Sequence, residues 1–310
     1  MACIIVTSFE QDRAWLRHRF GPSVRAAPST RQGEWSHAYA FAREGHEYVV
    51  RFSALDEDFR KDRFATRFAS PALPIPAILE IGETDEGFYA ISERVSGGFL
   101  DELDETGMRA SLPSLFAALD AMREAAPVGT TGYGIWGADG HAPHPSWRAA
   151  LLDIASDRPG DRIHGWRQRL AASPIGSGAF AQAYARLGES SDSCPEERHL
   201  IHSDLLNFNV LVADGLLSGV IDWGCAMWGD WLYDLAWFCF WAPWYPAWAG
   251  IDVAAEASRH HAAIGLDVPH VAERLACCQL HVGLSGMAYQ AFTERWDLLT
   301  ETAARTLELA

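Results

Sequence analysis

The sequence predicts an α+β protein of two lobes, a small N-terminal β-sheet lobe with one helix and a larger, mainly helical C-terminal lobe. Two observations predict this division. Residues 35–94 follow the order strand, strand, helix, strand, strand, whereas helical patterns prevail from about residue 99. Because the loop Ser96-Gly97-Gly98 separates the two patterns, we expect the lobes to comprise residues 1–96 and 97–310.

Local patterns place each element of the first lobe. A short helix is expected to precede the sheet and to end at Gly21-Pro22, because these residues do not continue a helix. The turn Glu44-Gly45 joins two alternating segments, and Pro71 stops the helix that follows them. The expected helices are Gln11–Phe20 and Asp56–Ser70, and the expected strands are Ala38–Phe41, Glu47–Phe52, Ala77–Ile81 and Gly87–Arg94.

The second lobe is expected to be helical apart from a Gly/Pro-rich loop over Pro127–Pro145. Its most apolar run, Leu232–Trp248, is interrupted by Asp234, Pro243 and Pro246. This run is shorter than a membrane span needs, so it predicts a buried helix followed by a loop. We therefore expect no membrane partner.

Composition narrows the classes of partner. The 310 residues include 49% hydrophobic residues, which is ample material for a core, and the formal charge is −16. This charge argues against nucleic acid as a partner, because nucleic-acid phosphates require Lys and Arg for affinity. An acidic surface suits a cationic substrate, although acidity alone also accompanies ordinary solubility.

The six cysteines lie mostly in apolar runs and show no paired metal spacing. Buried free thiols are therefore expected rather than disulfides, which is typical of a reducing compartment. The N-terminus has no basic region followed by a long apolar segment, so no signal peptide is expected. We predict a cytoplasmic monomer.

The most informative stretch, residues 199–222, predicts a β-hairpin that gathers polar side chains at one end. Two apolar runs, Asn209–Val212 and Leu216–Ile221, flank turn residues at Ala213-Asp214-Gly215. Antiparallel strands joined in this way place residues whose numbers sum to about 430 opposite each other. Asn209 and Asp222 should therefore meet at the open end, with Asp204 in the loop before the first strand.

These three side chains suit phosphoryl transfer. Mg²⁺ takes one or two protein oxygen ligands plus substrate phosphates, and Asn209 with Asp222 can supply them. Asp204, held off the metal, can accept a proton from an attacking hydroxyl. Each residue alone is more often a turn or cap residue, but their combination with His202 and Ile221-Asp222-Trp223 favours a catalytic site.

The same residues carry a family resemblance. The order His202-Ser203-Asp204, Asn209, Ile221-Asp222-Trp223, Gly229-Asp230 and Asp234-Leu235-Ala236 resembles the aminoglycoside phosphotransferase family, from about residue 30 to about residue 245. The resemblance implies a protein-kinase-like fold and ATP- or GTP-dependent O-phosphorylation of an aminocyclitol antibiotic. It also implies a phosphate-binding cleft between the lobes.

A kinase-like site needs a cation on the donor phosphates and a carboxylate that holds this cation. We assign these roles to Arg51 and Asp62, where most family members have Lys and Glu; a surface role for either residue remains open. The phosphate-covering segment would be Gly33–His37, in which Ser36 could donate to a phosphate while Glu34 points away. Glu93 and Val95 would offer main-chain groups to a purine.

Other polar and aromatic residues have supporting or acceptor-binding roles. His202 is expected to support the catalytic loop, and Asp234 to tie the following helix to it. Asp230 is a candidate for that helix's N-cap and for binding the acceptor. Trp241 and Trp244 could form a wall for sugar rings, or pack in the core as we expect for Trp237. Asp252, Glu256 and Asp267 are further acidic candidates that sequence does not rank.

Three functions remain open from sequence alone. The first is an Mg-dependent phosphotransferase that modifies an aminocyclitol antibiotic and gives resistance. The second keeps the chemistry but changes the acceptor to another hydroxylated small molecule, since fold does not set substrate. The third is a non-catalytic nucleotide-binding protein, which Arg51 and the single glycine of Gly33–His37 suggest and the intact Asp204, Asn209 and Asp222 oppose.

Overall fold

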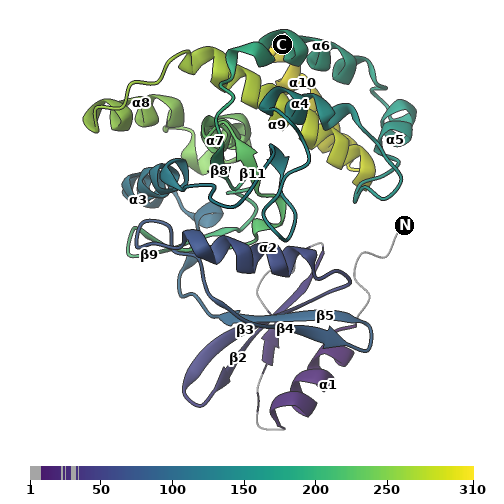
Figure 1. Cartoon of the computed structure of the whole chain (residues 1–310), viewed down its shortest axis with the longest axis vertical. Helices are drawn as coiled ribbons and strands as arrows, with labels where there is room; N and C mark the ends of the chain where they lie inside the picture. The colour runs from purple at the N-terminus through teal and green to yellow at the C-terminus, as the bar shows by residue number, and fades with distance from the viewer. Residues whose placement is uncertain (1–7, 22–23, 25, 29–32, 34) are drawn as a thin grey trace.

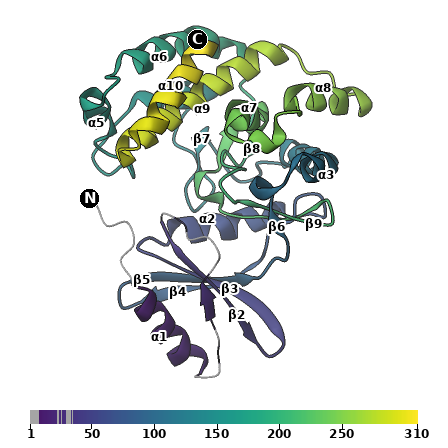
Figure 2. The ribbon, with the colours of Figure 1, turned by 180° about the vertical axis from the view of Figure 1, so that it is seen from behind.

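The computed structural model describes residues 8–21, 24, 26–28, 33 and 35–310. Figure 1 shows a β-sheet with helix α1 on its outer side, helix α2 on the other side, and a larger helical region beyond α2. The view from behind in Figure 2 shows the same order of layers. The predicted α+β architecture is therefore confirmed.

The first sheet is antiparallel, with strands in the order β1-β2-β3-β5-β4. All four strands predicted in this region are present, and Glu44 and Gly45 both have positive φ in the predicted turn, as tight hairpin turns require. One short edge strand was not predicted, because it contains Pro28 and has only three residues. The strands are β1 (Ala26–Pro28), β2 (His37–Arg43), β3 (His46–Ser53), β4 (Ile78–Thr84) and β5 (Gly87–Glu93).

Helix α1 (Phe9–Phe20) begins two residues before the predicted start. Ser8 and Gln11 form a capping box at its N-terminus, and Gly21 ends it. One carboxylate of this helix is buried: Oδ2 of Asp12 lies 2.8 Å from Nδ1 of His37 and accepts the hydroxyl of Tyr39 at 2.9 Å. These contacts fix α1 to β2.

Helix α2 (Glu57–Ala65) continues into a 3-10 turn, Thr66–Phe68, within the predicted range. It lies between the sheet and the helical lobe (Figure 1). Phe59 is buried toward the sheet, whereas the ring of Phe64 lies 5.1 Å from the ring of Trp136 in the second lobe. Lys61 and Asp62 are also buried, and each has a polar partner: the carbonyl of Gly224 for Lys61 and Arg51 for Asp62.

The second lobe surrounds two small antiparallel sheets, β10-β9-β6 and β7-β11-β8. Its longest helix, α9, packs against α5, α6, α7 and α10. The strands are β6 (Gly98–Phe99), β7 (Gly134–Ile135), β8 (His199–Ile201), β9 (Val210–Ala213), β10 (Leu216–Val220) and β11 (Met227–Gly229). The helices are α3 (Glu105–Glu124), α4 (Trp147–Leu152), α5 (Trp166–Ala172), α6 (Gly178–Ser190), α7 (Leu232–Trp241), α8 (Val253–Ala263), α9 (Val271–Thr293) and α10 (Trp296–Leu309).

The predictions for the cysteines and for the apolar run Leu232–Trp248 agree in part with the structure. The described cysteines are all free thiols, as predicted; Cys194, Cys277 and Cys278 are buried, whereas Cys239 is half-buried and Cys225 is exposed. Cys3 lies outside the described residues. The run from Leu232 forms the buried helix α7, as predicted. Among the described residues, no helix has the length and apolar character that crossing a membrane requires.

Candidate active site

The predicted hairpin is present with the predicted register. Paired residue numbers sum to 429 beside the turn and, after a register shift between Leu217 and Gly219, to 430 where Val210 pairs with Val220. The backbone N–H of Ile221 donates to the carbonyl of Asn209 at 2.9 Å, which extends this register by one pair. Asn209 and Asp222 therefore lie at the same end of the hairpin, as expected.

The loop between β8 and β9 is held from both sides. Asp234 of α7 accepts the backbone N–H groups of His202, at 2.9 Å, and Ser203, at 2.7 Å. The His202 ring lies 2.9 Å (Nε2) from the carbonyl of Ile221 and 4.6 Å from the Trp223 ring. Burial lowers the pKa of His202 to about 4, so the ring is neutral at pH 7 and suited to structural support.

Asp204 occupies the centre of this loop. Its Oδ1 accepts Nδ2 of Asn207 at 2.6 Å, and its Oδ2 accepts Nδ2 of Asn209 at 3.1 Å. Burial raises the pKa of Asp204 well above its usual range; the Asn207 bond opposes this rise and the nearby Asp222 charge adds to it. A raised pKa makes a carboxylate a stronger base. Ser203, Asn207 and Phe208 have positive φ, a strained backbone of the kind concentrated at functional sites.

Asn209 and Asp222 offer oxygen atoms of the type that Mg²⁺ prefers. Both hydrogen bonds that Asn209 forms through its side chain use Nδ2, so Oδ1 is available as a ligand with respect to the described residues. Asp222 is exposed and has φ of 63°, and the surrounding protein and the charge of Asp62 raise its pKa. A divalent cation would relieve this crowding of negative charge, so the donor set fits Mg²⁺.

Arg51, the predicted phosphate-binding cation, forms an ion pair with Asp62, its predicted partner. Nη2 of Arg51, on β3, contacts Oδ2 of Asp62, on α2. The other oxygen of Asp62 accepts the backbone N–H of Trp223 at 2.7 Å. Asp62 therefore joins Arg51 to the residue that follows Asp222. Sequence reasoning anticipated the pair but not this second bond, because its two residues are 161 positions apart.

The predicted purine-binding segment lies against the hairpin. An added Cβ at Gly219 would lie 2.8 Å from Cγ1 of Val95, so only glycine allows this approach. Ser218 also donates its hydroxyl to the carbonyl of Ser96 at 2.7 Å. Glu93 is exposed, and its N–H bonds the Ala77 carbonyl, so its own carbonyl is the group to consider for a ligand.

The phosphate-covering segment is described only in part. Ser36 is half-buried, and the expected orientation of Glu34 lies outside the described residues. His37 belongs to β2 and is bound to Asp12 rather than to this segment.

Asp101 is a site residue that sequence reasoning missed. It lies in the short 3-10 helix η2 (Leu100–Glu102) and accepts the backbone N–H groups of Asn207, at 2.8 Å, and Phe208, at 3.1 Å. Tyr245 donates its hydroxyl to the same carboxylate at 3.0 Å. Since Asp101 is more than a hundred residues from its partners, no local pattern marks it.

Asp101→Ala should lower kcat by up to about 10²-fold, because it releases the strained turn beside Asp204 and misplacement of a reacting group by about 1 Å has effects of this size. The matched control is Asp104→Ala. Asp104 caps α3 through the N–H of Gly107 at 2.8 Å, and its loss should cost about 1 kcal/mol of stability with kcat unchanged. Steady-state kinetics and thermal unfolding of both variants test this; equal kcat values would contradict it.

Several of the predicted acceptor-binding residues have hydrogen-bond partners within the second lobe. Trp244 donates its indole N–H to Glu301 of α10 at 3.0 Å, and Trp241 packs against Trp244 with ring centroids 5.0 Å apart. Both side chains are half-buried and pack against the core of the second lobe, which is the alternative to a sugar-binding surface. Trp237 packs into the core, as expected. Asp252 caps α8 by accepting the N–H of Ala255 at 3.0 Å.

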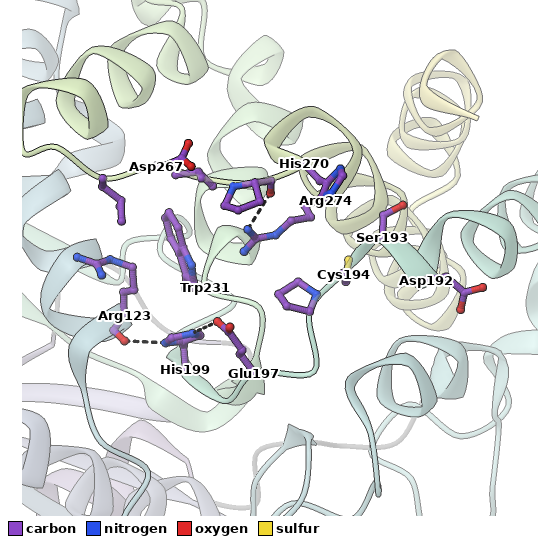
Figure 3. Close-up of a pocket in the computed structure, with 14 residues that line it drawn as sticks. Arg123, Asp192, Ser193, Cys194, Glu197, His199, Trp231, Asp267, His270 and Arg274 are labelled. Carbon is purple, nitrogen blue, oxygen red and sulfur yellow. Dashed lines mark hydrogen bonds and ion pairs between the residues drawn. The ribbon is translucent and has the colours of Figure 1, made fainter.

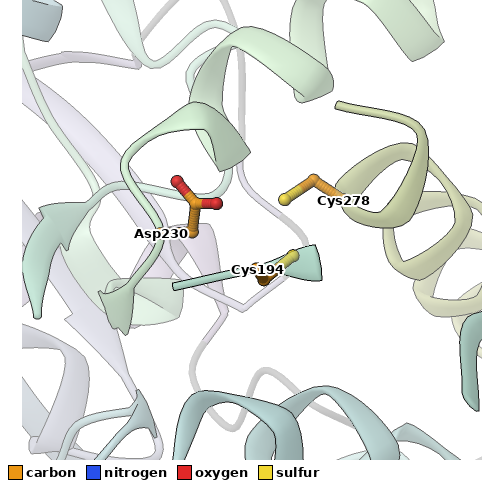
Figure 4. A group of neighbouring side chains, drawn as sticks. All are labelled: Cys194, Asp230 and Cys278. Carbon is orange, nitrogen blue, oxygen red and sulfur yellow. The ribbon is translucent and has the colours of Figure 1, made fainter. Parts of the chain in front are cut away.

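Asp230 has no exposed surface, so the prediction that it binds the acceptor is not supported. Arg274 of α9 donates to both of its oxygens, at 2.6 and 2.8 Å, and Leu232 N–H donates to Oδ1 at 3.1 Å, near the predicted capping position. The thiols of Cys194 and Cys278 lie beside it (Figure 4). Because the guanidinium already occupies the carboxylate, we assign this group as an ion pair and not as a metal centre.

A cavity of about 470 Å³ adjoins that ion pair. Figure 3 shows Trp231 at its wall between Arg123 and Arg274, whose guanidinium carbons each lie 5.7 Å from the indole ring. Its lining includes His199, at the start of β8, whereas Asp204 follows the end of β8. The cavity is thus at the opposite end of this strand from the catalytic loop.

Comparisons with known proteins agree with this geometry. A model of the phosphotransferase enzyme family (APH) matches residues 29–270. Hygromycin-B 4-O-kinase of Escherichia coli is 39% identical over 215 residues, which are 69% of this chain and 61% of that protein. The chain therefore matches less than two thirds of the length of this relative.

Solved structures give a more complete match. A thermostable mutant of aminoglycoside phosphotransferase APH(4)-Ia, in a ternary complex with AMP-PNP and hygromycin B, superposes with a TM-score of 0.83 at 33% identity, covering 98% of each chain. Spectinomycin phosphotransferase APH(9)-Ia has a TM-score of 0.62 at 14% identity, covers 98% of each chain and shares the fold. The segments Lys61–Arg63, Phe68–Pro76, Ile81–Glu83 and Cys194–Leu200 predict the closer likeness to hygromycin B phosphotransferase, which these matches confirm.

Proposed function

Because the chain belongs to the phosphotransferase enzyme family, we propose that it transfers the γ-phosphate of ATP or GTP to a hydroxyl of hygromycin B or a related aminocyclitol antibiotic. The observation that carries this proposal is the grouping of Asp204, Asn209 and Asp222 at the hairpin, with the Arg51–Asp62 pair bonded to Trp223. The relative's name specifies 4-O transfer, and we propose the same position. Resistance would be the cellular consequence.

Each residue of the proposed site has a separate role in the transfer. Asp204 orients the acceptor hydroxyl and accepts its proton, and its raised pKa favours that transfer. Arg51 holds the donor phosphates with its planar fork, and Asp62 fixes Arg51 in place. Ser36 faces the phosphates, and main-chain groups of Glu93 and Val95 bind the purine. Asn209 and Asp222 would hold Mg²⁺, which neutralises charge on the phosphates when it is bound.

With the lobes at residues 1–96 and 97–310, we infer that the donor held by Arg51 and the acceptor hydroxyl at Asp204 meet in line between them, so that catalysis is mainly positioning and electrostatic stabilisation. The charge of −16 agrees with a polycationic acceptor, because an acidic protein attracts cations from a distance.

The purified protein with Mg·ATP should add one phosphoryl group to hygromycin B, detected by mass spectrometry and located by NMR. Mg·GTP tested beside it decides the donor. Expression in a sensitive bacterium should raise growth on hygromycin B more than on other aminoglycosides. Phosphorylation of amino alcohols or sugars in place of any antibiotic would instead support a metabolite kinase, and nucleotide binding without transfer to any acceptor would refute the proposal.

A further inference from the structure

One arginine of the second lobe contacts two segments of the first. Arg162 lies in the loop between the 3-10 helix η3 (Asp153–Ala155) and α5. Its Nη1 and Nη2 donate to the two carboxylate oxygens of Asp58, on α2, at 2.9 and 2.8 Å. Its guanidinium carbon also lies 4.9 Å from the ring of Trp35, just before β2. This forked pair, with a stacked ring, is the geometry that Arg forms and Lys does not.

Asp58 lies beside the proposed metal ligand. An added Cβ at Gly224 would lie 3.0 Å from Oδ1 of Asp58 and 3.4 Å from Oδ1 of Asp222, so the two carboxylates approach the same glycine. Farther along α2, Nζ of Lys61 donates to the carbonyl of Gly224 at 3.1 Å. Asp62 accepts the N–H of Trp223, so α2 is bonded to residues 223–224 through Lys61 and Asp62, with Asp58 beside them.

The loop that carries Arg162 is built to be rigid. Asp157 accepts the N–H groups of Gly165, at 2.7 Å, and Arg167, at 3.1 Å, which closes the loop at its base. Asp161 accepts the N–H of Arg158 at 2.7 Å within it. The Arg162 and Asp58 side chains are only 29% and 15% exposed, so solvent screens their attraction less than that of a surface pair.

We propose that Arg162 is a positioning residue for phosphoryl transfer. By holding Asp58 and Trp35, it sets the position of α2 and of the segment before β2 relative to the catalytic loop. The Arg51–Asp62 pair belongs to the first lobe and Asp204 to the second. In-line transfer therefore requires a defined distance between the phosphate-binding residues of one lobe and the catalytic loop of the other. This inference rests on the proposed function.

The test compares Arg162→Ala, Arg162→Lys and Asp58→Asn with a matched control. Arg158→Ala is that control, because Arg158 lies in the same loop and its guanidinium pairs through both terminal nitrogens with Asp153 of η3, in its own lobe. Arg162→Ala should lower kcat/KM for ATP by about 10- to 100-fold, through both kcat and KM, with KM for the antibiotic unchanged. Arg162→Lys should recover part of the loss. Asp58→Asn combined with Arg162→Ala should be no worse than the stronger single change, since paired residues are not additive.

Nucleotide affinity, measured by calorimetric titration without acceptor, separates this inference from the proposed function. If the wild type phosphorylates no acceptor but Arg162→Ala still weakens ATP binding relative to Arg158→Ala, the proposed function fails, while the role of Arg162 in positioning the nucleotide-binding residues stands. The positioning role is overturned if Arg162→Ala matches Arg158→Ala in both ATP affinity and kcat/KM. It is also overturned if only KM for the antibiotic changes, which would make Arg162 an acceptor-binding residue.

Discussion

Asp204→Asn should lower kcat by about 10²- to 10⁴-fold, the range that a positioned general base contributes. Asparagine keeps the size of the side chain; its oxygen can still accept Nδ2 of Asn207, and only the 3.1 Å bond from Nδ2 of Asn209 is lost, so the loop should stay folded. The amide does not accept the proton of the acceptor hydroxyl. Nucleotide affinity should remain near the wild-type value, because Arg51 and Asp222 are untouched and Asn209 keeps its 2.8 Å bond to the backbone carbonyl of residue 204.

Single-turnover kinetics with saturating ATP, together with calorimetric titration of the nucleotide, measure both quantities. Asp214→Asn provides the control, since it makes the same chemical change in the turn at the other end of the hairpin. Asp214 has φ of 52°, a conformation that asparagine tolerates, so activity should be retained there. A kcat for Asp204→Asn within a few fold of wild type would exclude Asp204 as the base.

Local sequence rules were largely sufficient for the catalytic hairpin. The turn at Asp214-Gly215 and the two apolar runs predict its register to within one residue, whereas the shift between Leu217 and Gly219, which pairs Val210 with Val220, carries no local signal. The strands of the first sheet were predictable from local patterns, whereas the pairing of β3 with β5 was not, because α2 and β4 lie between them in the chain. Strand β1 was not predicted, because its three residues, which end in a proline, carry no alternating pattern.

The contacts that hold the site together were not predictable from local patterns. Asp101 with Asn207, Arg162 with Asp58, and Asp62 with Trp223 each join residues more than a hundred positions apart. A single sequence shows that these side chains are charged but not which partners the fold brings to them. Asp230 illustrates the consequence, because an acidic residue near a catalytic motif suggested ligand binding while the fold supplied Arg274.

That pair predicts the largest effect on stability. Asp230 lies between β11 and α7, and Arg274 lies in α9. Their ion pair therefore joins the segment before α7 to the longest helix of the second lobe. The side chains are 0% and 7% exposed. Removing one partner leaves the other charge buried without compensation, so Arg274→Ala should lower the free energy of unfolding by about 3–5 kcal/mol.

Urea unfolding followed by fluorescence measures this loss, with Arg186→Ala as the control. Arg186 pairs with Glu189 at 2.9 Å on the surface of α6, with side chains 56% and 68% exposed, and such pairs contribute about 0–1 kcal/mol. Equal destabilisation by Arg274→Ala and Arg186→Ala would contradict the prediction. The double variant Asp230→Leu with Arg274→Met should recover much of the loss, because apolar side chains of similar volume remove both charges together. The N–H of Leu232 would still lose its acceptor, at about 1–3 kcal/mol for an unsatisfied buried donor, so recovery should be incomplete.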